Sequence, residues 1–128
     1  MPRVPGALHT CGVFTLEQAR AQLAAAQPHI AELLTHRADL AELRADLDAS
    51  GASPLGRLAE VKAWEAALYA DLEYLAQSGA QVKGFAPLLL DYPGERDGVD
   101  VLWCWLEGEP DITWYHRIDT GFAGRRPI

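Results

Sequence analysis

Hydrophobic residues recur in alternating steps of three and four along the first part of the chain, from residue 14 to about residue 50. This spacing places them on one face of a helix. Thr15 and Gln18 form a capping-box pattern, and Phe14 is placed as a hydrophobic staple, so we expect the helix to begin here. Pro28 removes one backbone donor, which predicts a helix kinked near Pro28 or two helices in line. The stripe consists of Leu16, Ala19, Leu23, Ala26, Ile30, Leu33, Leu40 and Leu47.

A second amphipathic stretch follows a cluster of small residues and a proline at 50–54, which ends the first helix. We expect a second helix from about Pro54 to Gln77, ended by Ser78 and Gly79. Two long amphipathic helices joined by a short loop must pack antiparallel. Residues 14–78 are therefore predicted to form a helical hairpin.

Polar residues interrupt the apolar seam of the first helix. Arg37 and Arg44 either lie at its edge or pair with acids such as Glu65 or Asp71, from the second helix or from a partner chain.

Two histidines, His29 and His36, lie seven residues apart on one helix face, and with helix carboxylates they could form a metal site. Such sites normally use Glu-x-x-His pairs, which are absent here. A solvated helix face is therefore the favoured interpretation of carboxylates such as Glu32.

The pattern becomes β-prone after Gly79. A run interrupted by a glycine and a proline supplies one strand or two shorter ones, and two later β-prone segments joined by a tight turn form an antiparallel hairpin. The prediction is an α+β fold, with a small antiparallel sheet in residues 79–128. The segments are 82–90, a loop at 93–98, then 99–106, a turn at 107–110, and 111–116.

Both faces of the predicted β-hairpin carry large apolar side chains. One face is lined by Val101, Trp103 and Trp105, and the other by Leu102, Cys104 and Leu106. Since a small antiparallel sheet normally has one wet face, helices should cover one face and something else the other. A homodimer partner is the simplest candidate.

Composition fits one domain. The chain has 128 residues, of which 49% are hydrophobic and 23% charged, which is ordinary for a globular protein. Residues 1–13 have no periodicity and are read as a loose lead-in to the single domain 1–128. The net charge of −7 has the wrong sign for nonspecific nucleic-acid binding.

The cysteines suggest a reducing compartment. Cys11 and Cys104 form no CxxC pair or Cys/His ladder, so a structural zinc site is not expected, and two lone cysteines fit the cytoplasm. No signal peptide or membrane-spanning run is present in the sequence, so we expect a cytoplasmic protein with no membrane contact.

The C-terminal segment from Trp114 onward is the candidate functional region. It carries His116 and Asp119 near a strand end, two glycines that permit an anion-binding nest, and arginines suited to carboxylate or phosphate. We therefore predict a binding or interaction protein that holds an anionic small molecule. The predicted ligand-binding residues are Arg117, Gly121, Gly124, Arg125 and Arg126.

Three other interpretations stay open. His116 could act as a general acid or base, with Asp119 orienting it and Arg125 binding an anionic substrate. Alternatively, His116 could hold a metal ion with Asp119 or Glu109. The structural interpretation is favoured over catalysis: His116 hydrogen-bonds to backbone and Arg125 clamps the tail to Glu109 or Asp111. The sequence indicates no particular cofactor or reaction.

Four motifs together resemble a known bacterial family, domain of unknown function 2203. They are Phe14-Thr15-Leu16-Glu17-Gln18-Ala19, a proline in the first helix, Val101-Leu102-Trp103-Cys104-Trp105 with Gly108-Glu109-Pro110-Asp111-Ile112, and Trp114-Tyr115-His116 with the tail from Gly121 to Ile128. The resemblance implies a bacterial cytosolic protein with a helical hairpin and a C-terminal β unit, and it marks residues 116–126 as typical of the family. It supplies no mechanism, because the family has no established activity. Gln27 departs from the leucine expected before Pro28.

Overall fold

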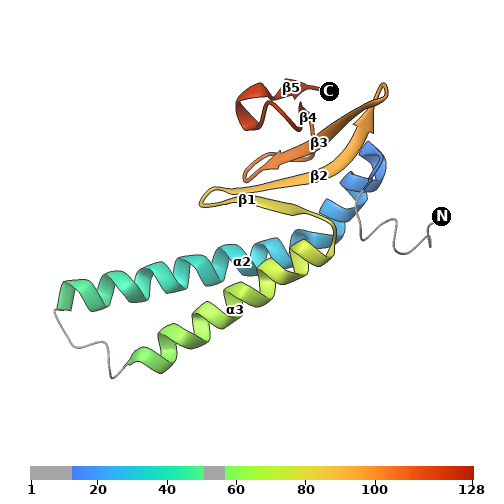
Figure 1. Cartoon of the computed structure of the whole chain (residues 1–128). Coiled ribbons are helices and arrows are strands. Elements are labelled where there is room, and N and C mark those ends of the chain that lie inside the picture. Colours follow the sequence, from blue (N-terminus) through green and yellow to red (C-terminus); the bar gives the residue numbers. More distant parts are fainter. Residues whose placement is uncertain (1–12, 51–56) are drawn as a thin grey trace. The chain divides into compact units, whose positions relative to one another are not determined.

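The computed structural model describes residues 13–50 and 57–128, which form two helices followed by a five-stranded antiparallel sheet (Figure 1). Helix α2 spans Leu16–Ser50 and helix α3 spans Leu58–Gln77. The predicted α+β class is confirmed. The lead-in and the predicted helix start at Pro54 lie outside the described residues.

The chain divides into two compact units. The helical unit contains residues 27–74. The sheet unit contains the remainder of the described chain, residues 13–26 and 75–128.

The start of α2 is fixed by the predicted capping box. The Thr15 amide donates to Gln18 Oε1 at 2.9 Å, and the Gln18 amide donates to Thr15 Oγ1 at 3.1 Å. These bonds satisfy two donors that a helix start leaves open. Phe14 is buried just ahead of them.

Helix α2 continues through Pro28. The alternative of two helices in line is therefore wrong, because the backbone keeps its helical conformation on both sides of the proline. A kink at Pro28 stays a prediction.

The helical unit is an antiparallel hairpin, as three side-chain pairs show. His29 stacks on Tyr74, His36 bonds to Asp71, and Arg44 bonds to Glu65. Partner numbers fall as α2 positions rise, which requires opposite helix directions. The predicted pairing of Arg44 with Glu65 is confirmed at 2.8 Å, whereas Asp71 accepts from His36. Ile30, Leu33, Leu40, Leu43 and Leu68 are buried in this unit.

The sheet unit contains the strands in sequential order, each antiparallel to its neighbour. The β-prone run at 82–90 contributes to two strands, which was one of the two predicted alternatives. A short 3-10 helix, η2, spans Phe122–Gly124. The strands are β1 Gln81–Phe85, β2 Leu88–Arg96, β3 Val99–Leu106, β4 Trp114–Arg117 and β5 Arg126–Pro127.

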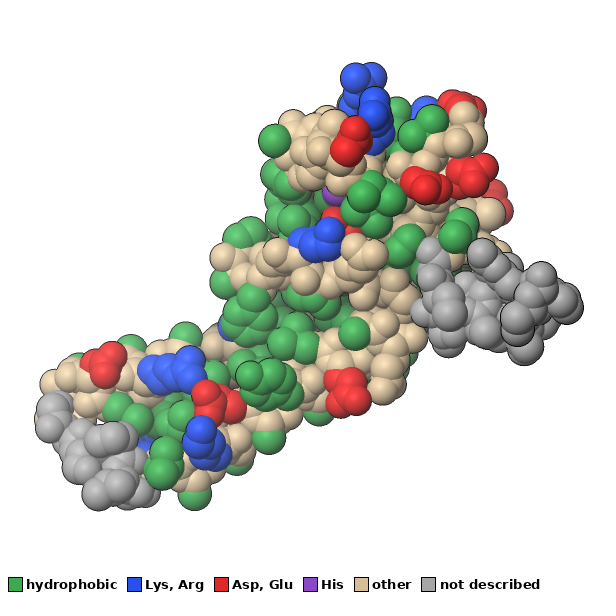
Figure 2. Space-filling model, viewed as in Figure 1, with side chains coloured by type: hydrophobic (Ala, Val, Ile, Leu, Met, Phe, Trp, Pro, Cys, Tyr) green, Lys and Arg blue, Asp and Glu red, His purple; other side chains and the backbone are tan. Residues whose placement is uncertain are grey.

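The predicted loop at 93–98 is wrong, because β2 runs on to Arg96 and pairs there with Val99. Asp97 and Gly98 alone make the turn, with φ angles of 53° and 78°. Asp-Gly tolerates this left-handed conformation, which suits the twist of a two-residue hairpin. In Figure 2, acidic side chains gather at this end of the sheet, where Glu95, Asp97 and Asp100 lie.

One side of the sheet, the helix-side face, packs against the first residues of α2. The indole of Trp103 donates to the Phe14 carbonyl at 2.8 Å, and the Phe14 amide donates to the Pro93 carbonyl at 2.7 Å. Arg20 adds a bond to the Ile112 carbonyl at 2.8 Å. The buried side chains of this face are Leu88, Leu90, Tyr92, Val101, Trp103 and Trp105.

The opposite side, the tail-side face, is also buried within the chain. Leu102 is 3% exposed and Cys104 is 0% exposed. Arg125 from the C-terminal segment lies over the Trp114 ring, 5.0 Å from its centroid. These positions are buried without a second chain, so the homodimer stays a prediction that the burial of the hairpin does not require.

Candidate functional site

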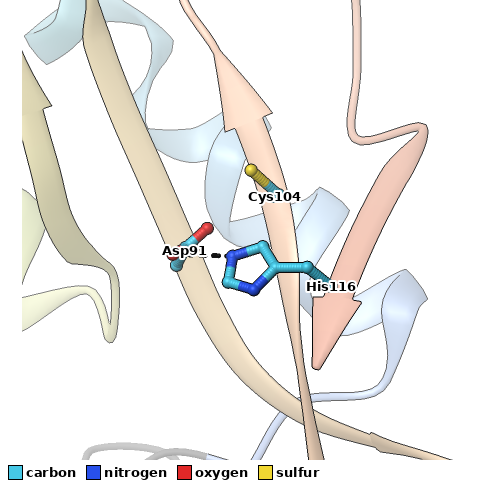
Figure 3. Close-up of side chains that lie close together, drawn as sticks. All are labelled: Asp91, Cys104 and His116. Atoms are coloured by element: carbon cyan, nitrogen blue, oxygen red, sulfur yellow. Dashed lines mark hydrogen bonds and ion pairs between the residues drawn. The ribbon is translucent and has the colours of Figure 1, made fainter. Parts of the chain in front are cut away.

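The tail-side face brings together Asp91, Cys104 and His116 from three adjacent strands (Figure 3). Cys104 pairs with Asp91 across β2 and β3, and His116 pairs with Leu102, two residues from Cys104 on β3. Paired residues in an antiparallel sheet share a face, as do residues two apart. One ligand atom from each side chain lies within 4.8 Å of the other two.

Two acceptors hold the imidazole of His116. Nδ1 lies 2.8 Å from the Arg117 carbonyl oxygen, and Nε2 lies 3.1 Å from Asp91 Oδ2. A carbonyl can only accept, so Nδ1 carries a hydrogen. The remaining nitrogen, Nε2, is the atom that the ring presents to Asp91 and to the cluster.

Asp91 is a carboxylate in an almost fully buried position, 1% exposed. Its Oδ2 faces His116 and lies 3.7 Å from the Lys83 ammonium, whose side chain is half-exposed. Its Oδ1 is buried and has no hydrogen-bond partner. Burying a carboxylate oxygen is costly without a hydrogen bond or a cation nearby, and the thiol of Cys104 is the neighbouring group that can donate to Asp91.

The thiol of Cys104 is kept protonated by its surroundings. Burial raises its pKa to about 12, and the nearby negative charge of Asp91 acts in the same direction. Arg125 opposes both effects. The thiol is therefore a poor nucleophile by itself.

The raised pKa of Cys104 predicts that the metal-free protein loses stability at alkaline pH. Its folded pKa of about 12 exceeds the ordinary value of 9.0. Above pH 9.0 the unfolded chain loses this proton before the folded chain does, so stability that is complete below pH 9.0 falls as the pH rises toward 12. The free energy of unfolding in urea should fall more steeply over this interval for wild type than for Cys104→Ala. Equal slopes would contradict the assignment.

Arg125 clamps the C-terminal segment to the turn between β3 and β4. Its Nη2 donates to Glu109 Oε1 at 2.6 Å, and the same oxygen accepts from the Leu106 amide at 2.7 Å. The guanidinium also lies 4.8 Å from the Phe122 ring centroid. The Arg125–Glu109 pairing is confirmed, as the structural interpretation predicted.

The other predicted site residues lie apart from the buried cluster. Arg117 and Asp119 pair with each other at 2.7 Å on the surface, so Asp119 does not orient His116, whose carboxylate partner is Asp91. Arg126 is exposed in β5. His116 is 3% exposed, so its ring is not open to a substrate from solvent as the predicted acid/base role would require.

The two glycines shape the tail. Gly121 has a φ of 64° at the start of η2, and Gly124 lies against Thr120 with no space for a Cβ atom. Both serve the turn that returns the chain to the sheet. In Figure 2, basic side chains gather above this C-terminal segment.

Sequence reasoning missed Asp91 and did not connect Cys104 to His116. One signal was available, because Asp91 is an acid directly after the apolar run Leu88–Leu90 in a β-prone region. Acids are rarely fully buried without a partner.

Comparison with known proteins gives one match. A family model described as an uncharacterized conserved protein, DUF2203, matches residues 12–128. The chain belongs to DUF2203. The searches of curated proteins and of solved structures found no match. The matched DUF2203 region includes Asp91, Cys104 and His116 and the Arg125–Glu109 clamp. Neither α2 nor α3, over the residues that the structure describes, is apolar enough to cross a membrane.

Proposed function

We propose that this DUF2203 protein binds a divalent transition-metal ion of the zinc class through Asp91, Cys104 and His116. The main support for this proposal is that a carboxylate oxygen, a thiol sulfur and an imidazole nitrogen all lie within 4.8 Å of one another. Zinc sites are built from these three donor types. The ligands differ from the expected set of His116 with Asp119 or Glu109.

The hydrogen bond of His116 supports a ligand role. Histidines that bind metals commonly donate their other ring N–H to a backbone carbonyl or carboxylate, which fixes the tautomer and the ring orientation. The Arg117 carbonyl performs this task here at 2.8 Å from Nδ1. On binding an ion, Nε2 would exchange its hydrogen, which faces Asp91 in the metal-free protein, for a bond from its lone pair to the ion.

The charges also support a divalent ion. A carboxylate from Asp91 and a thiolate from Cys104 would together neutralise two positive charges, and the orphaned Oδ1 of Asp91 would gain a nearby cation. The guanidinium of Arg125 is already paired with Glu109. Since metals bind the thiolate, the ion would displace the thiol proton, and affinity should fall as the pH falls.

The test is a titration of untagged, chelator-stripped protein with Co²⁺, followed by competition with Zn²⁺. Wild type should develop a thiolate-to-cobalt charge-transfer absorption that Zn²⁺ removes. Cys104→Ser should lose this absorption, and His116→Ala should weaken Co²⁺ binding at this site more than tenfold, beyond the loss typical of an outer-shell partner.

Cys11→Ser is the matched control, because it removes the other thiol of the chain. It should keep the absorption unchanged. The proposal fails if wild type gives no thiolate absorption, or if the absorption follows Cys11 instead of Cys104.

A thiol ligand also bears on the compartment. Cys104 is a free, buried cysteine, and thiols persist in reducing surroundings. This supports the cytosol as the location. The test is to count the reduced cysteine thiols per chain in protein extracted directly from intact cells, where every chain should carry Cys104 as a free thiol.

A further inference from the structure

We infer that the helical unit holds a second metal ion, bound by His29 and Glu32 of α2 and Asp71 of α3, at a site with no sulfur ligand. One ligand atom from each of these residues lies within 4.8 Å of the other two. His29 and Glu32 are three residues apart, which places them as neighbours on one helix face. The ion would join the two helices of the hairpin.

The ring of His29 is held in place before any ion binds. It stacks on the Tyr74 ring, with centroids 3.5 Å apart and planes inclined by 16°. A ligand whose orientation is already fixed loses less freedom on binding. Tyr74 thus positions the imidazole from the same helix that supplies Asp71.

Asp71 is held in the same way by an outer partner. It is 4% exposed, and its Oδ2 lies 2.7 Å from His36 Nδ1. Carboxylates that bind metals are commonly held by such outer hydrogen bonds. His36 is one helical turn beyond Glu32 on α2, so the positioning residue and two ligands share one face.

The types of ligand atom at this site limit which ions can bind. Two carboxylates and an imidazole suit divalent ions such as manganese, iron, cobalt or zinc, and the carboxylate charges would balance the ion. Glu32 is exposed and His29 is half-exposed, so the ion can reach the site from solvent. This differs from the buried, sulfur-containing cluster of the sheet unit, and the inference does not depend on it.

The sequence interpretation set aside a metal site at His29 and His36 because no Glu-x-x-His pair is present. The structure contains the reverse order, His29-x-x-Glu32, and supplies the second carboxylate from α3. A spacing of three residues places two side chains on the same helix face whichever of them comes first, so His29 and Glu32 still share a face.

The experiment is calorimetric and optical titration of the untagged full chain with Co²⁺ after chelator treatment, in a Cys104→Ser background. This background should bind one Co²⁺ per chain, with no thiolate charge-transfer absorption. Adding Glu32→Gln should weaken this binding at least about tenfold, since even outer-shell partners cost that much. Glu32 is exposed, so this variant should fold; circular dichroism would confirm it.

Glu42→Gln is the matched control, because Glu42 is an exposed carboxylate on the same helix. It should leave Co²⁺ affinity unchanged, and Tyr74→Leu should lower the affinity by freeing the His29 ring. Unchanged affinity in Glu32→Gln, or no Co²⁺ binding in the Cys104→Ser background, would overturn the inference. Loss of the thiolate absorption alone bears on the sheet site and not on this one.

Discussion

Replacing His116 by alanine is expected to lower the free energy of unfolding of metal-free protein by about 3–5 kcal/mol, the cost of breaking a buried ion pair by removing one partner. The variant leaves the Asp91 carboxylate, 1% exposed, without its bond to Nε2 at 3.1 Å. Lys83 cannot substitute fully, because it lies 3.7 Å away and its side chain is 45% exposed. Urea denaturation in the presence of a chelator measures the loss.

A double-mutant cycle with Asp91→Ala separates this pair from simple loss of packing. The double variant should lose clearly less than the sum of the single losses, because neither charge is then left unpaired. Additive losses would show that the pair is not coupled. Arg117→Ala is the control: its pair with Asp119 is exposed, so its effect should stay within about 1 kcal/mol.

Replacing Gly94 by alanine is expected to destabilise the protein by about 3 kcal/mol, at the upper end of overpacking costs. A Cβ atom at Gly94 would collide with Trp103 Nε1 and lie 2.6 Å from the Phe14 carbonyl oxygen. That indole and that carbonyl are bonded to each other at 2.8 Å. The substitution therefore separates the start of α2 from the sheet.

Hydrogen exchange at the indole N–H of Trp103 measures whether its bond to the Phe14 carbonyl is lost. Its hydrogen-exchange protection should disappear in Gly94→Ala and persist in the control Gly98→Ala. Gly98 has open space around its Cβ position and a φ of 78°, so alanine there costs about 1–2 kcal/mol of backbone strain without touching Trp103. Retained protection in Gly94→Ala would refute the steric argument.

The helices and most strands could be predicted because their signals are local. Thr15 and Gln18 mark a helix start through side chains three apart, and they form the predicted bonds. The strand Val99–Leu106 coincides with the predicted segment 99–106. The β2–β3 turn was mispredicted because Pro93 and Gly94 suggested a loop. In the structure Pro93 and Gly94 pair with Phe14, which lies about 80 residues away in the chain.

The candidate site could not be predicted because it depends on strand register. Asp91 faces Cys104 only because Asp97 and Gly98 alone form the turn between their strands. A shift of one residue would move every side chain of a strand to the other face. The ion pair of Arg125 with Glu109 was accessible from sequence as one alternative, whereas His116 needed a partner from β2 that no local pattern indicated.

The sheet offers little backbone at either free edge. β5 has only two residues, one of which, Pro127, has no amide hydrogen, and β1 is irregular between Val82 and Gly84 and carries Lys83. Short, charged or proline-containing edges discourage strand addition from another chain. The sheet unit is thereby protected against edge-to-edge aggregation, and chains that associate through it must use side-chain surfaces in place of a continued hydrogen-bond ladder.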